Sequence, residues 1–123
     1  MILVDTSVWI AHLRWQLPDL AALLSQQKVL VHPFVIGELA CGQIRNRTAI
    51  LQFLSDLPRV ALATNDEVLR LIEDRHLWGR GIGFADFHLL ASAALTRCQF
   101  WTSDRRLGET ATGLGLNWQS KPQ

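Results

Sequence analysis

Short apolar runs alternate with segments of helical periodicity along this chain. The runs predict buried strands at 2–4, 29–31, 60–63, 99–102 and 116–118. The intervening segments place apolar residues three and four positions apart, which predicts helices after Thr6 or Ser7, at 19–26, 33–42, 48–54, 66–78 and 86–96, and between Asp104 and Gly113. Because parallel strands need crossover helices, this alternation predicts an α/β fold with three α/β/α layers around a central parallel sheet.

Length and composition fit one globular domain over residues 1–123. No low-complexity tract or linker marks a boundary, and 49% hydrophobic with 19% charged residues is the balance of a folded soluble protein. Cys41 and Cys98 are isolated, which favours a reducing compartment over a disulfide framework. With no membrane-length apolar run and no signal peptide, a cytoplasmic protein is expected, without a membrane partner.

The formal net charge of +1 provides no overall field toward nucleic acid. Ten of the twelve basic residues are nevertheless arginine, whose planar guanidinium can hold two phosphate oxygens. Arg80, Arg105 and Arg106 are the candidates for contacts with a phosphate backbone; solvated surface arginines are the ordinary alternative.

Four carboxylates stand where parallel sheets bind their ligands. Asp5 and Asp104 come just after apolar strands, Asp86 lies at a helix start, and Glu38 lies among apolar residues in a predicted helix. Each has an ordinary structural interpretation, as a helix cap for the aspartates and as an exposed side chain for Glu38. If the four converge, however, their charges repel unless protons or a cation neutralise them.

An all-oxygen set of this kind suits Mg²⁺ or Mn²⁺, whereas the scattered histidines and cysteines offer no zinc site. Such a site chiefly serves phosphate-ester hydrolysis by metal-activated water. Hydroxyl residues beside the acids are candidates for bonding to the carboxylates or to metal-bound water: Thr6, Ser7, Thr102 and Ser103.

Four segments of the chain together resemble the PIN domain, particularly toxins of the VapC type. They are "LVDTSVWI", "VIGELACG", "GIGFADFHLLASA" and "FWTSDRRL", which occur in the order and spacing of that family. The resemblance implies that Asp5, Glu38, Asp86 and Asp104 are catalytic ligands for Mg²⁺ or Mn²⁺, and Thr102 matches the family's hydroxyl position. It further implies an endoribonuclease that acts on RNA, is blocked by a cognate VapB-type antitoxin, and forms a homodimer.

Two other functions are compatible with parts of this pattern. A phosphoacceptor signalling domain also clusters acids at strand ends, but it needs a lysine after a late strand, and Lys28 and Lys121 are not so placed. A non-catalytic RNA-binding or partner-binding module could keep the fold without the chemistry. Acid-dependent Mn²⁺ binding distinguishes a nuclease from such a module.

Overall fold

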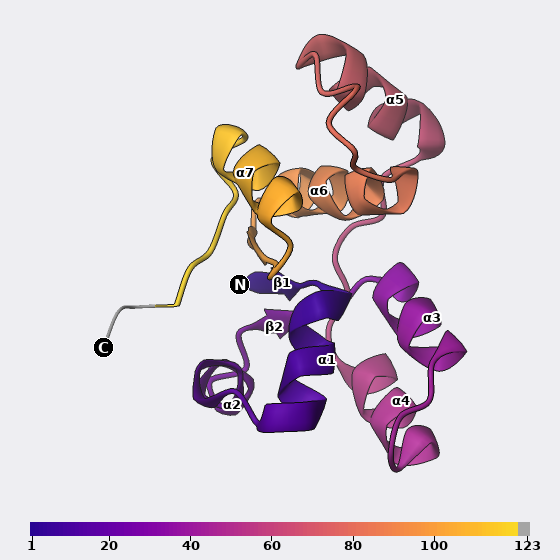
Figure 1. The fold of residues 1–123 in the computed structure, drawn as a ribbon, viewed down its shortest axis with the longest axis vertical. Coiled ribbons are helices and arrows are strands. Elements are labelled where there is room, and N and C mark those ends of the chain that lie inside the picture. The colour runs from indigo at the N-terminus through magenta and orange to yellow at the C-terminus, as the bar shows by residue number, and fades with distance from the viewer. Residues whose placement is uncertain (121–123) are drawn as a thin grey trace.

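The computed structural model describes residues 1–120 of the chain. Figure 1 shows helices gathered around a small central sheet. Its strands are β1 (Ile2–Val4), β2 (Val29–Leu30) and β3 (Gln99–Trp101), and its helices are α1 (Thr6–Trp15), α2 (Pro18–Ser25), α3 (Pro33–Cys41), α4 (Arg47–Asp56), α5 (Asn65–Asp74), α6 (Phe84–Thr96) and α7 (Arg105–Gly113). This is the α/β architecture expected from the alternation of apolar runs and helical periods.

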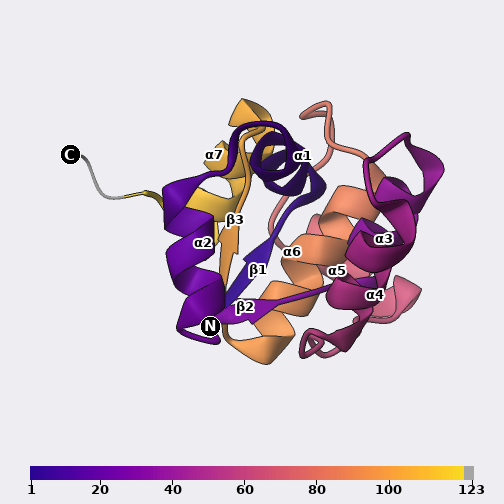
Figure 2. The same ribbon diagram turned by 90° about the horizontal axis from the view of Figure 1, so that it is seen from below.

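All three strands are parallel, in the order β2-β1-β3. Leu3 of β1 is paired with Leu30 on one side and Phe100 on the other, and all three side chains are buried. Figure 2 shows α2 on one side of the strands and α6 on the other, which is the expected three-layer arrangement. A sheet covered on both faces explains why the strands read as uninterrupted apolar runs.

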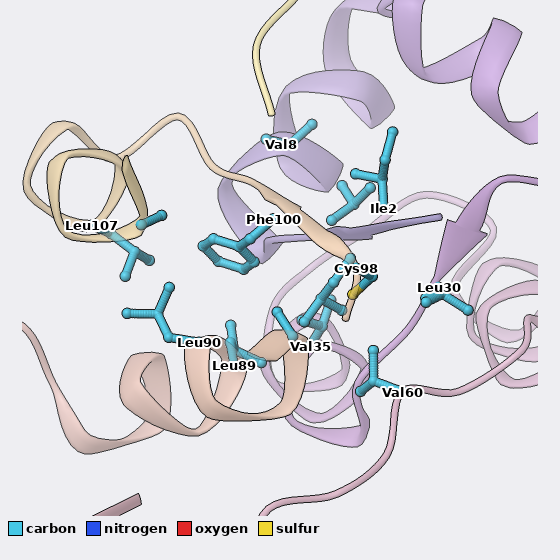
Figure 3. Close-up of a cluster of buried hydrophobic side chains, with 14 of the residues drawn as sticks. Ile2, Val8, Leu30, Val35, Val60, Leu89, Leu90, Cys98, Phe100 and Leu107 are labelled. Carbon is cyan, nitrogen blue, oxygen red and sulfur yellow. The ribbon is translucent and has the colours of Figure 1, made fainter. Parts of the chain in front are cut away.

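The hydrophobic core lies between the sheet and its covering helices. Figure 3 shows Phe100 of β3 facing Leu89 and Leu90 of α6, with Leu107 of α7 beside them. Phe100, Leu89 and Leu90 are fully buried. Truncating such a side chain costs about 3–5 kcal/mol of unfolding free energy, so this layer fixes α6 and α7 against β3.

Two predicted strands are reduced to single bridges. Within residues 1–120, the segment predicted as a strand at 60–63 has a single bridge beside it, between Val31 and Arg59, and the segment at 116–118 has one, between Phe100 and Asn117. Backbone hydrogen bonds accompany these bridges, including one of 2.7 Å from the Phe100 N–H to the Leu116 carbonyl. Both segments therefore extend the sheet edges without forming full strands.

Helix starts differ from the predicted caps in two places. Asp5, rather than Thr6 or Ser7, occupies the cap position of α1. Thr64 rather than Asn65 caps α5, because its hydroxyl accepts from the Glu67 N–H while the Glu67 carboxylate accepts from the Thr64 N–H. The α5 helix also ends at Asp74 rather than near Trp78.

Strand order brings the candidate acids to one edge. From the central β1 the chain reaches β2 on one side and later β3 on the other, so the crevice at the ends of β1 and β3 is a topological switch point. A helix joining parallel strands runs back against them, which starts α6 at this same edge. Residues from four distant segments can therefore meet there.

Candidate metal-dependent nuclease site

Asp5 follows β1 and is only 5% exposed. Although it occupies the cap position of α1, its side chain makes no capping hydrogen bond. Instead its Oδ2 atom accepts two hydrogen bonds of 2.7 Å each, from the Ser7 and Thr102 hydroxyls. These bonds explain how a carboxylate is accommodated at the end of a buried strand, and they fix its orientation.

Thr102 links Asp5 to the segment that carries Asp104. The Thr102 Oγ1 atom donates to Asp5 and accepts from the Asp104 N–H at 3.0 Å. The Ser7 hydroxyl accepts from the Ser103 N–H, also at 3.0 Å. Two sequence-predicted hydroxyls, Ser7 and Thr102, thus tie the ends of β1 and β3 together.

Asp104 caps α7, where its Oδ1 atom accepts from the Leu107 N–H at 2.9 Å. The ordinary structural interpretation of this residue as a helix cap is therefore correct. A carboxylate has further lone pairs on both oxygens, so capping with Oδ1 leaves acceptor capacity at Asp104.

Asp86 lies in the first turn of α6 and is half-buried. Burial, followed by the charges of Asp5, Glu38 and Asp104, raises the pKa of Asp86 to about 6, against a smaller lowering by a backbone hydrogen bond at Gly83. The structure therefore places the other three predicted acids within electrostatic range of Asp86.

Glu38 lies on the exposed face of α3. His32 orients this helix, because its Nδ1 atom accepts from the Phe34 N–H at 2.9 Å and caps the first turn. Burial, with the nearby charges of His88 and Arg59, lowers the pKa of His32 to about 4, which keeps the ring neutral at pH 7. This capping role was not predicted from the sequence; a histidine directly before proline at a helix start was the available signal.

The four carboxylates share one neighbourhood without forming a closed cage. Among residues 1–120, no three Asp, Glu, His or Cys side chains lie together closely enough to hold one metal ion. The donor set still fits a hard divalent cation, since its charged groups are all carboxylates, and burial together with the other three charges raises the pKa of Asp86.

The other residues predicted from the sequence differ in their burial and in their contacts. Thr6 is buried and its hydroxyl has no hydrogen-bond partner in the part of the chain described, while Ser103 joins through its backbone N–H. Arg105 forms an exposed ion pair with Glu109 at 3.2 Å.

Arg80 and Arg106 belong to neighbouring surface segments. Arg80 is exposed in the loop before α6. The Arg106 guanidinium lies against Gly81, whose φ of +74° and lack of a Cβ allow this close approach. The α7 start and the loop before α6 are therefore in contact next to Asp104.

Comparison with known proteins identifies the family of this chain. The PIN domain profile matches residues 2–113. Two relatives, both named Ribonuclease VapC32 and found in Mycobacterium tuberculosis strains CDC 1551 / Oshkosh and ATCC 25618 / H37Rv, are each 50% identical over 117 residues. These alignments cover 94% of this chain and 94% of each relative. The chain belongs to the PIN-domain family.

Proposed function

We propose that this protein is a metal-dependent endoribonuclease and the toxin component of a VapBC-type toxin-antitoxin system. The observation that carries the proposal is that the charges of Asp5, Glu38 and Asp104 all act on Asp86, in a parallel-sheet fold and in a chain 50% identical to named ribonucleases. Family membership also removes the phosphoacceptor alternative.

Asp5, Glu38, Asp86 and Asp104 would hold Mg²⁺ or Mn²⁺. A bound ion of this type lowers the pKa of water, so that hydroxide is available at neutral pH to attack a phosphodiester. The protein's part is orientation: Ser7 and Thr102 hold Asp5, and α7 holds Asp104 through its cap. Asp86, with a pKa of about 6, is largely ionised at pH 7 and ready to bind a cation.

The proposal also includes the location of the protein and its partners. None of the helices in residues 1–120 combines the length and apolar character needed to cross a bilayer. Cys41 and Cys98 are both free thiols, which supports a reducing, cytoplasmic setting. From the relatives' names and from the family we infer three partners: an RNA substrate, a VapB-type antitoxin, and a second copy of the chain in a homodimer.

The direct test is RNA cleavage by purified protein with Mg²⁺ or Mn²⁺. We expect cleavage to stop with EDTA and to fall at least about a hundredfold in Asp5→Asn, because electrostatic groups at reacting centres contribute on this scale. Asp74→Asn, an exposed carboxylate at the end of α5, is the matched control and should cleave normally. Undiminished cleavage by Asp5→Asn would contradict the mechanism.

A further inference from the structure

A cleft of about 800 Å³ opens beside Glu38. It lies between the C-terminal ends of α1 and α3 and the segment leading into α4, which Figure 1 shows together on one side of β1. Its polar and aromatic lining includes His12, Arg14, Trp15, Gln43, Arg45 and Asn46. Because Glu38 also lines it, the cleft adjoins the acidic set.

The cleft is locally basic although the whole chain is nearly neutral. Of residues 1–120, two arginines, Arg14 and Arg45, and one carboxylate, Glu38, line it. His12 contributes little to this charge, since burial lowers the pKa of its ring, against a smaller raising by a hydrogen bond from the Leu17 N–H. The positive charge therefore comes from two guanidiniums that are free to meet phosphate oxygens.

Trp15 gives the cleft an open aromatic surface. It is the last residue of α1, and its side chain is 75% exposed, more than any other large hydrophobic residue of the described chain. Apolar side chains such as Leu13 and Ile44 form the rest of the lining around it. An exposed indole between arginines is the combination that binds unpaired nucleotides, through base stacking and phosphate contacts.

We propose that this cleft binds a single-stranded segment of the RNA next to the bond that is cut, with Arg14 and Arg45 on its phosphates and Trp15 stacked on a base. The inference rests on the proposed nuclease function and adds where the substrate lies. Arg105 and Arg106 directly follow Asp104 at the start of α7, so basic residues adjoin the acidic set at both Glu38 and Asp104. An RNA strand crossing the acids would meet positive charge on either side.

The test is binding of a short fluorescent single-stranded RNA to the full chain in EDTA, followed by anisotropy. Arg14→Glu/Arg45→Glu should weaken binding at least about tenfold, and it should reduce the salt dependence of log K by about 0.7 for each phosphate that the protein no longer neutralises. The control, Lys28→Glu/Arg97→Glu, makes the same charge change at residues preceding β2 and β3, on the opposite edge of the sheet, and should stay within about twofold of wild type. Trp15→Ala should weaken binding about five- to tenfold, and Trp15→Phe should largely restore it.

Equal RNA affinity for the two double variants would overturn the proposal and leave the cleft to a protein partner. Because binding is measured without metal, this outcome is separate from failure of the nuclease proposal. That failure would appear as undiminished cleavage by Asp5→Asn or as no cleavage by the wild-type protein.

Discussion

The two carboxylates that follow strands are held differently from the two that lie on helices. Asp5 accepts from two hydroxyls, and Asp104 accepts from the first turn of α7. Glu38 is exposed on α3, while Asp86 has the raised pKa of a half-buried group beside three like charges. One half of the acidic set is fixed by hydrogen bonds, and the other is placed chiefly by its helices.

This difference assigns two physical roles within one site. The strand-end half is oriented before any ligand arrives, which lowers the cost of organising the site. The helix-borne half carries electrostatic repulsion that costs stability, a common property of functional clusters. Changes at the first half should therefore act on activity, and changes at Asp86 should also act on folding.

Among substitutions outside the four acids, Thr102→Val should have the largest effect on activity. It removes the hydroxyl that donates to Asp5 and accepts from the Asp104 N–H while keeping the side-chain shape. Loss of such a supporting bond should lower kcat/KM for RNA cleavage by about ten- to a hundredfold.

Thr102→Ser, which keeps the hydroxyl, should recover most of that activity. Thr112→Val is the control, because Thr112 is exposed on α7 and its hydroxyl donates to the Gly108 carbonyl, away from Asp5. Wild-type kcat/KM in Thr102→Val would show that orientation of Asp5 does not depend on this bond.

Asp86→Asn should stabilise the metal-free protein by about 1–2 kcal/mol at pH 7 while abolishing cleavage. Its folded pKa of about 6 lies above the ordinary 3.8, so the ionised group opposes folding at neutral pH. This penalty disappears as the pH falls from 6 toward 4, where Asp86 is protonated in the folded state. Urea unfolding of the wild type and of Asp86→Asn in EDTA, at pH 7 and at pH 4.5, measures the difference in unfolding free energy at each pH.

Glu38→Gln sharpens the same comparison. Because Glu38 is exposed, its substitution should stabilise the protein by less than half as much as Asp86→Asn under identical conditions. Equal stabilisation by the two variants would show that the repulsion is shared evenly and does not fall mainly on Asp86.

His32→Asn tests the cap of α3 rather than the acidic set itself. The folded pKa of His32, about 4, lies below the ordinary 6.5, so the stability from its neutral form is complete above pH 6.5 and declines as the pH falls toward 4. Asparagine can cap α3 without titrating. Between pH 7 and pH 5 the unfolding free energy of this variant should therefore fall by about 1 kcal/mol less than that of the wild type. Urea unfolding of both proteins at pH 7 and at pH 5 measures these changes. Equal losses of unfolding free energy in the two proteins would contradict this role of His32.

The architecture could be predicted because strands that are buried on both faces of a sheet appear in the sequence as uninterrupted apolar runs. The runs at 2–4, 29–31 and 99–102 correspond to β1, β2 and β3, and helical periodicity located the helices between them. The segment at 60–63 failed as a strand because pairing depends on a distant neighbour, and only Arg59 meets Val31. Local composition carries no information about that distance.

The candidate acids could be identified from the sequence, whereas the hydrogen bonds that hold them could be predicted only in part. Placement after apolar strands drew attention to Asp5 and Asp104, but pairing of the Thr102 hydroxyl with Asp5 joins residues 97 positions apart. The cleft was not identifiable, because Arg14 and Arg45 come to line it only when α1 packs against α3. Such long-range features require the folded structure.

The most direct test of the account is calorimetric titration of the wild-type protein with Mn²⁺, beside the variants Asp5→Asn, Glu38→Gln, Asp86→Asn and Asp104→Asn. We expect Mn²⁺ to bind the wild type and Asp74→Asn alike and to bind each of the four variants at least about tenfold more weakly. Absence of Mn²⁺ binding to the wild type, or binding that all four substitutions leave unchanged, would contradict a shared cation site and favour a non-catalytic binding module.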